Sequence, residues 1–413
     1  MGYDFYMKKL FFIALIFLFV LFCVSFLHSK TDSSVRIKFS AWGSQSEVEY
    51  LLPLIADFEK NNPDIKIEFL HIPQNYFQKL HLLFASKLAP DVVFINNQYL
   101  PKYVEAGLLL DLSDIFDSSD YFEKAIQNMT INGKIYAIPR DVSNFVVFYN
   151  KDLFDKYNIK YPSANWGFDE YIEISEKFKQ NGVWATSFDT NLIFLLPYLF
   201  SNGGGFLDND ADDYVIDDKN TIDTLNFYSN LAKNGYAPKK SESASLTMAQ
   251  LFLQQKIAMH VCGRWLVPKY RAEANFSWDI VQFPKGNKGS VTSIDASGYA
   301  ISSQTLNKDE AIRFVQYISS KTSLEKLVQS GLIVPARKDV AYSKMFLDPS
   351  LKPQNSKIFV DIIEQGKVTP VNRNYQKIMD VLQVVLEPVF LGKLKAQDVV
   401  SDELLIELRR YVY

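Results

Sequence analysis

Residues that commonly carry catalytic or metal chemistry are few and far apart in this sequence. It contains four histidines, and His71, His81 and His260 have no cysteine or second histidine at the spacing of a zinc site. The sequence also lacks a nucleophile elbow, a zincin helix and a phosphate-binding loop. We therefore predict no catalytic residue, no metal and no cofactor. Carboxylates are plentiful, so a carboxylate pair is the catalytic arrangement that stays open.

One acidic run superficially resembles a calcium-binding loop. It reads Asp-Asn-Asp-Ala-Asp-Asp over residues 208–213. The sixth position of such a loop requires glycine and the twelfth requires glutamate, but Asp213 and Lys219 stand there. The run is therefore interpreted as a solvated turn.

The N-terminus predicts export. Lys8 and Lys9 precede an uncharged apolar run over residues 10–27, so residues 1–30 are a signal peptide or an N-terminal membrane anchor. Cys23 lies where a lipoprotein signal would place its acylated cysteine, although small residues do not precede it. Lipidation of Cys23 and a plain apolar position in an anchor both stay open. Cys262 is the other cysteine and is expected to be a buried free thiol.

Length and charge restrict the class of protein. A chain of 413 residues is too long for one ordinary core, so two domains are expected. The formal net charge of -3 argues against binding to nucleic acid, which requires a clustered basic excess.

The first hundred residues alternate between strand and helix patterns. Strands are predicted at 35–41, 65–69 and 92–95, from alternation or from a short apolar run. A helix containing Pro53 is expected to start at a capping box of Ser46 and Glu49 and to run to residue 60, and a second helix covers 76–88. This order predicts an open, mostly parallel sheet.

Later segments extend the α/β pattern. Strands are predicted at 134–138, 145–149, 279–283 and 299–302, helices at 168–179 and 222–233, and a mainly helical C-terminal region at 308–330 and 376–411. Since no flexible linker divides the chain, two domains would be joined by short ordered strands that can act as a hinge.

A series of short motifs resembles a known family. In order along the chain they are FSAWG (39–43), LIADFEKNNP (54–63), APDVV (89–93), AGLLLDL (106–112), NGKIYAIP (132–139), FYNKDLF (148–154), WGFDE (166–170), NGGG (202–205), IAM (257–259), GRW (263–265), SGYAI (297–301) and PAR (335–337). This series resembles the extracellular solute-binding proteins of ABC importers, in the branch of maltose, trehalose and glycerol-phosphate binders.

The resemblance implies a two-lobe periplasmic-binding-protein fold of type II, with crossing hinge strands and a helical C-terminal region. It implies a first lobe of residues 35–141 plus 296–340 and a second lobe of 142–295 plus 341–413. The implied function is non-enzymatic capture of a sugar by hinge closure and delivery to ABC permease subunits, by an exported and anchored monomer. The alternatives are a membrane-tethered sugar sensor and a secreted carbohydrate-active enzyme.

Candidate ligand contacts follow the predicted strands of an open α/β sheet. A sugar ring needs an aromatic platform for its C–H faces and planar polar groups for its hydroxyls. Trp42, Gln45 and Glu47 follow the first strand, and Asn96 and Asn97 follow the third. For Gln45 and Glu47, an ordinary capped helix start is the alternative.

The resemblance adds further contacts. It implies Asp141 as a ligand acid and Trp265 as the aromatic platform of the second lobe, with a solvated turn acid and a core tryptophan as the alternatives. Ser297, Gly298 and Tyr299 would lie at the second crossover between lobes. Tyr76 and Arg373 resemble contact positions of the glycerol-phosphate branch, although Arg373 could equally be a surface ion-pair partner. Trp166, Trp184 and Trp278 are expected to be packing residues.

Overall fold

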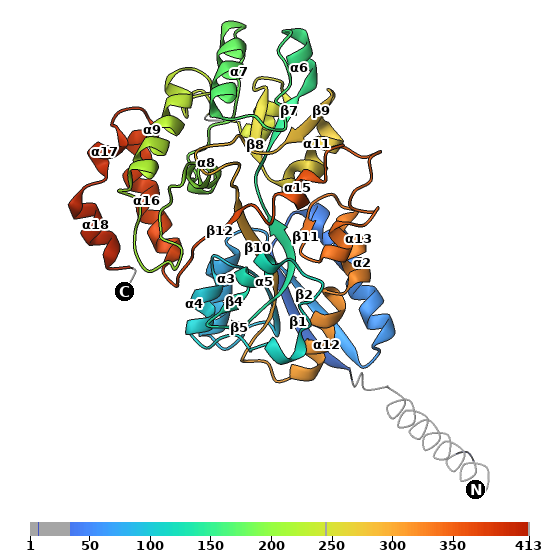
Figure 1. The fold of residues 1–413 in the computed structure, drawn as a ribbon. Helices are drawn as coiled ribbons and strands as arrows, with labels where there is room; N and C mark the ends of the chain where they lie inside the picture. Colours follow the sequence, from blue (N-terminus) through green and yellow to red (C-terminus); the bar gives the residue numbers. More distant parts are fainter. Residues whose placement is uncertain (1–6, 8–33, 244–245, 412–413) are drawn as a thin grey trace.

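The chain folds into two α/β lobes (Figure 1). This computed structural model describes residue 7, residues 34–243 and residues 246–411. Apart from Met7, the predicted leader, including Cys23, lies outside the residues described. The first lobe is defined here as the body that holds a seven-stranded sheet, and the second lobe as the body that holds a three-stranded sheet. Lobes of this composition confirm the predicted α/β fold class.

The sheet of the first lobe has the order β11-β6-β10-β3-β1-β2, with β12 beside β10. Its parallel part is β1 (Val35–Ala41), β2 (Ile65–His71) and β3 (Val92–Asn96), as predicted. Strand β6 (Ile138–Ser143) runs antiparallel to β10 (Ser293–Ile301), and β10 also runs antiparallel to β3 but parallel to β12. The prediction of a mostly parallel sheet is therefore wrong, because β10 enters this sheet from the other lobe and not through a local crossover helix.

Helix α2 (Gln45–Asn61) starts earlier than predicted. Its N-cap is Ser44, whose hydroxyl accepts a hydrogen bond from the backbone N–H of Glu47 at 3.3 Å. The predicted capping box of Ser46 and Glu49 is wrong by two residues. Helix α2 continues past Pro53. Helix α3 (Tyr76–Ala85) ends before Leu88, because Lys87 takes a left-handed conformation with φ 58°.

The remaining elements of the first lobe are short. The predicted strand at 134–138 divides into β5 (Lys134–Ile135) and the start of β6. The other elements are β4 (Thr130–Ile131), α4 (Leu100–Glu105), α5 (Glu123–Asn128), α12 (Lys308–Ile318), α13 (Lys321–Val328), β11 (Val334–Pro335) and α14 (Lys338–Ala341). The predicted helix over 308–330 is thus two helices, since Ser320 starts a new one by capping the backbone N–H of Ser323.

The second lobe is built on β7 (Val146–Asn150), which pairs antiparallel with β8 (Met259–Cys262) and β9 (Trp278–Val281). Its helices are α6 (Lys151–Lys156), α7 (Phe168–Gln180), α8 (Leu196–Asn202), α9 (Lys219–Lys233), α10 (Met248–Leu253), α11 (Val267–Glu273), α15 (Ile358–Asp361), α16 (Tyr375–Phe390), α17 (Ala396–Val399) and α18 (Asp402–Arg409), and β12 (Lys367–Val368) returns to β10. The predicted helix over 376–411 is therefore three helices, and Gly392, with φ 69°, follows the first of them.

Expected packing residues of the second lobe lie where the sequence suggested. Trp166 and Trp278 are buried, and the indole N–H of Trp166 donates to the carbonyl of Gln282 at 2.8 Å. Trp184 is half-buried against the core. Cys262 is a buried free thiol, as predicted, and burial raises its pKa.

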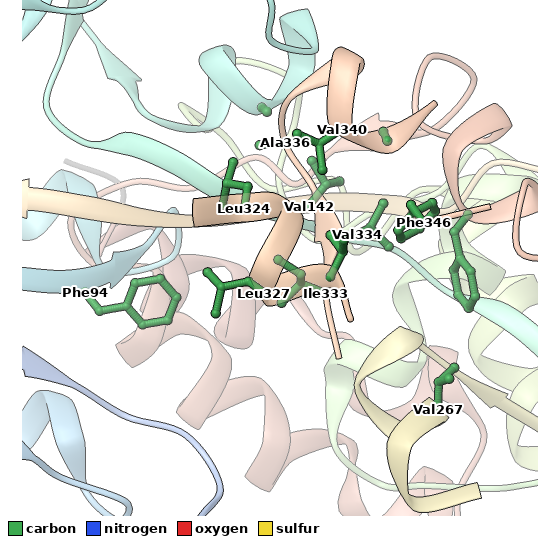
Figure 2. Packing of buried hydrophobic residues seen from close by; sticks show 14 of the residues in the cluster. Phe94, Val142, Val267, Leu324, Leu327, Ile333, Val334, Ala336, Val340 and Phe346 are labelled. Carbon is green, nitrogen blue, oxygen red and sulfur yellow. The ribbon is translucent and has the colours of Figure 1, made fainter. Parts of the chain in front are cut away.

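One apolar cluster runs from the first lobe into the second (Figure 2). We call its middle part the apolar seam: Leu324, Leu327, Ile333, Val334, Phe346 and Val267. Val267 belongs to helix α11 of the second lobe, and a side chain added at Gly331 of the first lobe would lie 3.5 Å from it. The lobes therefore touch on this side through buried apolar groups. The exact residues at which the chain passes between the lobes stay a prediction.

Candidate binding site

A cavity of about 400 Å³ lies between residues of the two lobes. Its first-lobe wall includes Trp42, Ser44, Glu47, Arg140 and Asp141. The second lobe contributes two neighbouring side chains, Arg264 and Trp265. The remaining lining residues are Val142, Ser143, Ser297, Leu332 and the two seam residues Ile333 and Val334.

Trp42 is held by aromatic side chains of the first lobe. It follows β1 directly, and its ring centroid lies 4.1 Å from that of Phe94 and 5.2 Å from that of Tyr76. Tyr76 is itself buried, and its hydroxyl exchanges a hydrogen bond of 2.9 Å with Ser40. The Trp42 ring is therefore fixed before any ligand arrives.

Arg140 joins the two carboxylates of the first-lobe wall. One terminal nitrogen lies 2.5 Å from Glu47 Oε1, and its Nε lies 2.5 Å from Asp141 Oδ2. The guanidinium also lies over the ring of Phe94, 4.0 Å from the centroid. Burial alone would lower the pKa of Arg140, but Asp141 and Glu47 raise it above its usual range. Each carboxylate keeps one oxygen that can accept from a ligand hydroxyl.

Trp265 follows β8 and lies over its own backbone. A side chain at Gly263 would come within 1.8 Å of the indole Cζ3, so only glycine leaves room for this ring. The edge of Phe145 supports it, with centroids 5.5 Å apart and ring planes at 89°. Trp265 lines the first cavity and two further ones, so the ring lies where three hollows meet.

The second cavity, of about 220 Å³, is lined by both polar and apolar side chains. Asn96, Asn97, Gln98, Asp295 and Ser297 contribute to it. The side-chain amide of Asn97 donates to Asp295 Oδ1 at 2.8 Å, which ties the end of β3 to the crossing strand β10. Burial raises the pKa of Asp295, and the hydrogen bond from Asn97 opposes that rise.

The third cavity, of about 430 Å³, extends along the second lobe past Asp189, Gln250, His260 and Lys269. His260 is buried, with its Nδ1 at 2.5 Å from the hydroxyl of Tyr270. Burial lowers the pKa of His260 to about 3, so its imidazole is neutral at physiological pH.

Seven of the sequence-predicted contacts line these cavities: Trp42, Glu47, Asn96, Asn97, Asp141, Trp265 and Ser297. Five do not. Gln45 points to solvent in the first turn of α2, and Tyr76 supports Trp42 from behind. Arg373 is exposed and pairs with Glu105 at 3.3 Å, as the surface alternative anticipated.

Gly298 and Tyr299 are the remaining two. A side chain at Gly298 would lie 2.4 Å from the carbonyl of Ile138, so this glycine allows close approach of β6 and β10 and not of a ligand. Tyr299 is buried in the first-lobe core beside Phe39 and Phe94.

Several lining residues were not predicted: Ser44, Gln98, Arg140, Ser143, Arg264 and Asp295. Arg140 directly follows one motif of the family resemblance, and Arg264 belongs to another. Their positions in the sequence could therefore have indicated a role at the site. Their burial was not, because arginine is usually exposed.

Within the described residues, no cluster of histidine, cysteine, aspartate and glutamate could hold a metal ion. In the same part of the chain, no helix combines the length and the apolar character needed to cross a membrane.

Comparisons with known proteins agree with this geometry. Residues 53–353 match the model of a family described as bacterial extracellular solute-binding protein. The galactooligosaccharide-binding protein of Bacillus subtilis is 22% identical over 379 residues, which cover 88% of this chain and 87% of the relative. The diacetylchitobiose binding protein DasA of Streptomyces coelicolor is 24% identical over 68% of each chain.

Solved structures share the fold. An ABC substrate-binding protein of Listeria monocytogenes, in complex with cycloalternan, superposes with a TM-score of 0.82 at 26% identity, covering 92% of this chain and 98% of the other. The GacH receptor of Streptomyces glaucescens, solved unliganded and with acarbose, gives a TM-score of 0.80 at 20% identity over 91% and 97% of the two chains. Both likenesses confirm the two-lobe fold.

Proposed function

Because the chain belongs to the bacterial extracellular solute-binding proteins, we propose that it binds a carbohydrate between its lobes and delivers it to the permease of an ABC importer. The observation that carries this proposal is the pair Trp42 and Trp265, one from each lobe, which line the same cavity. Aromatic faces on opposite walls suit the C–H faces of a pyranose.

Polar groups complete the match to a sugar. Glu47 and Asp141 offer acceptor oxygens beside Trp42, and Asn96, Asn97 and Gln98 offer amides in the adjoining cavity. Such planar groups hydrogen-bond hydroxyls in defined directions. Because the three hollows meet at Trp265, an oligosaccharide fits this layout better than a single ring. The names of the B. subtilis and S. coelicolor relatives also point to oligosaccharides.

The binding cycle requires no chemical step. One lobe binds the sugar first, and rotation about the crossing strands β6 and β10 brings the second tryptophan onto it. The two carboxylates of the first cavity share one guanidinium, which suits them as hydrogen-bond acceptors, although burial raises the pKa of Asp141 against the effect of Arg140. We therefore propose a binding protein without enzymatic activity, acting as a monomer.

The leader completes the proposal. Residues 1–30 direct export, and either lipidation of Cys23 or an uncleaved anchor keeps the protein at the membrane. Mass spectrometry of the protein from its native membrane distinguishes a cleaved and acylated chain from an intact one.

A panel of carbohydrates tests the main proposal. Calorimetry and thermal shift should find saturable binding, with a Kd near micromolar corresponding to about -8 kcal/mol. Chromatography should recover the ligand unchanged. Conversion of any bound sugar into products would reject the binding role in favour of an enzyme, and failure of every carbohydrate would reject the ligand class.

A further inference from the structure

Arg264 is a buried cation without a counter-charge. Its exposed fraction is 3%, and within the described residues it forms no ion pair with a carboxylate. Its Nε has no hydrogen-bond partner, and one terminal nitrogen makes a long contact of 3.5 Å with Ser356 Oγ. The Ser356 hydroxyl already donates to the carbonyl of Pro353. Burial and the nearby Arg271 lower the pKa of Arg264 to about 9, which leaves it charged at neutral pH.

The aromatic rings beside Arg264 hold the guanidinium in place. Its carbon lies 4.2 Å from the ring centroid of Phe346 and 5.3 Å from that of Phe359. Figure 2 shows Phe346 as part of the apolar cluster. The aromatic faces attract the cation but do not use its N–H donors. Arg264 thus lines the cavity with a guanidinium that is nearly fully buried and whose Nε–H has no hydrogen-bond acceptor.

Arg140 lines the same cavity and has the carboxylate partners that Arg264 lacks among the described residues. It is equally buried, but two carboxylates neutralise it at 2.5 Å. An uncompensated buried charge is costly, so a protein that keeps one usually pairs it when the functional partner arrives. The four charged groups of the cavity, Glu47, Asp141, Arg140 and Arg264, sum to zero, so a single negative charge is easier to accommodate than the double charge of a phosphate.

We propose that the bound carbohydrate is acidic and that its carboxylate forms a two-pronged hydrogen bond with Arg264. The substrate class is a uronate or another sugar acid, alone or within an oligosaccharide. Guanidinium and carboxylate match in this geometry. The inference rests on the proposed carbohydrate-binding function and names the chemical group by which the second lobe selects its ligand.

Methyl esters provide the test, because an ester removes the charge and keeps the sugar ring. Calorimetry compares galacturonate, glucuronate and N-acetylneuraminate, and the di- and trisaccharides of the two uronates, each with its methyl ester. At least one acid should bind, and its ester should bind at least about tenfold more weakly. In Arg264→Met the preference should disappear, and in Arg264→Lys it should be intermediate, since lysine keeps the charge without the fork. Arg313→Met, at an exposed ion pair with Asp64, is the control and should keep the preference.

Other outcomes separate the two claims. Tight binding of neutral sugars with no gain from a carboxylate overturns the inference and leaves the proposed function intact. An equal loss of acid and ester binding in Arg264→Met also overturns it, because Arg264 would then latch the lobes or bind hydroxyls. A preference for sugar phosphates or sulfates over carboxylates overturns the chosen acid. Binding of no carbohydrate at all overturns both claims.

Discussion

The two walls of the first cavity differ in how completely their charged side chains are paired before a ligand binds. In the first lobe, Arg140, Glu47 and Asp141 satisfy one another, and Trp42 is packed against Phe94. In the second lobe, Arg264 lacks a carboxylate partner among the described residues, and Trp265 is bordered by three hollows. The first wall is a complete template before binding. The second wall is left to be completed by the ligand, and this is where we expect selectivity to reside.

Breaking the ion-pair network of the first wall should give the largest effect, a loss of folding stability. Arg140→Met leaves two buried carboxylates without their cation, so the free energy of unfolding should fall by about 3–5 kcal/mol in denaturant titrations. Adding Glu47→Gln and Asp141→Asn should restore part of that loss. A loss below about 1 kcal/mol for Arg140→Met would mean that the first wall is not held by this network.

Removing the aromatic ring of Trp265 from the second wall should instead reduce ligand affinity. Trp265→Ala should weaken affinity for any carbohydrate ligand by about 2–3 kcal/mol, on the order of 100-fold, in calorimetry. Tyr161→Ala, at a distant and partly exposed ring of the second lobe, is the matched control and should leave affinity unchanged. Unaltered affinity in Trp265→Ala would show that the second wall does not supply the platform.

The protonation state of His260 bears on the comparison of the two walls. A protonated His260 would add a second cation, beside Arg264, to the second lobe. Its pKa is about 3 in the folded protein and about 6.5 when unfolded, so the unfolded chain binds the extra proton between these values. Stability should therefore be fully present above pH 6.5 and be lost as pH falls. Between pH 6.5 and 5 the loss from this group is about 2 kcal/mol.

His260→Gln should remove that contribution, which makes the unfolding free energy less dependent on pH by up to one proton. Equilibrium unfolding at several pH values measures the difference between the two proteins. Identical pH slopes would mean that folding does not lower the pKa of His260.

The smallest effect on stability is expected at Arg264. Arg264→Met should change the free energy of unfolding by less than about 1 kcal/mol, or raise it, because the lost cation–π contacts are offset by relief of an unpaired buried charge. Thermal and denaturant unfolding of the unliganded protein give this value. A fall comparable to that of Arg140→Met would erase the distinction between the walls.

Local patterns were enough for much of the fold. The alternation of Ile37, Phe39 and Ala41 predicted β1 to the residue, and the apolar run before Asn96 predicted β3. Features that depend on tertiary contacts were not accessible. The start of α2 moved to Ser44, and the direction of β10 followed from its crossing between lobes.

The site shows the same division. Residues placed directly after strands, such as Trp42 and Asn97, line cavities, because the sheet topology determines their position. Tyr299 also lies on a crossing strand, but its side chain points into the first-lobe core. Burial of Arg140 and Arg264 depends on partners far away in the sequence, and no local pattern encodes it.

The apolar seam has a further consequence for how the molecule can be divided. Val267 packs against a cluster that begins in the first lobe. A fragment containing only one lobe would therefore expose the apolar surface of the seam to water. The halves should thus melt together as a single cooperative unit and resist separate production. A reporter domain inserted to read out ligand capture belongs at the opposite rim, where Arg373 meets Glu105 through exposed polar groups.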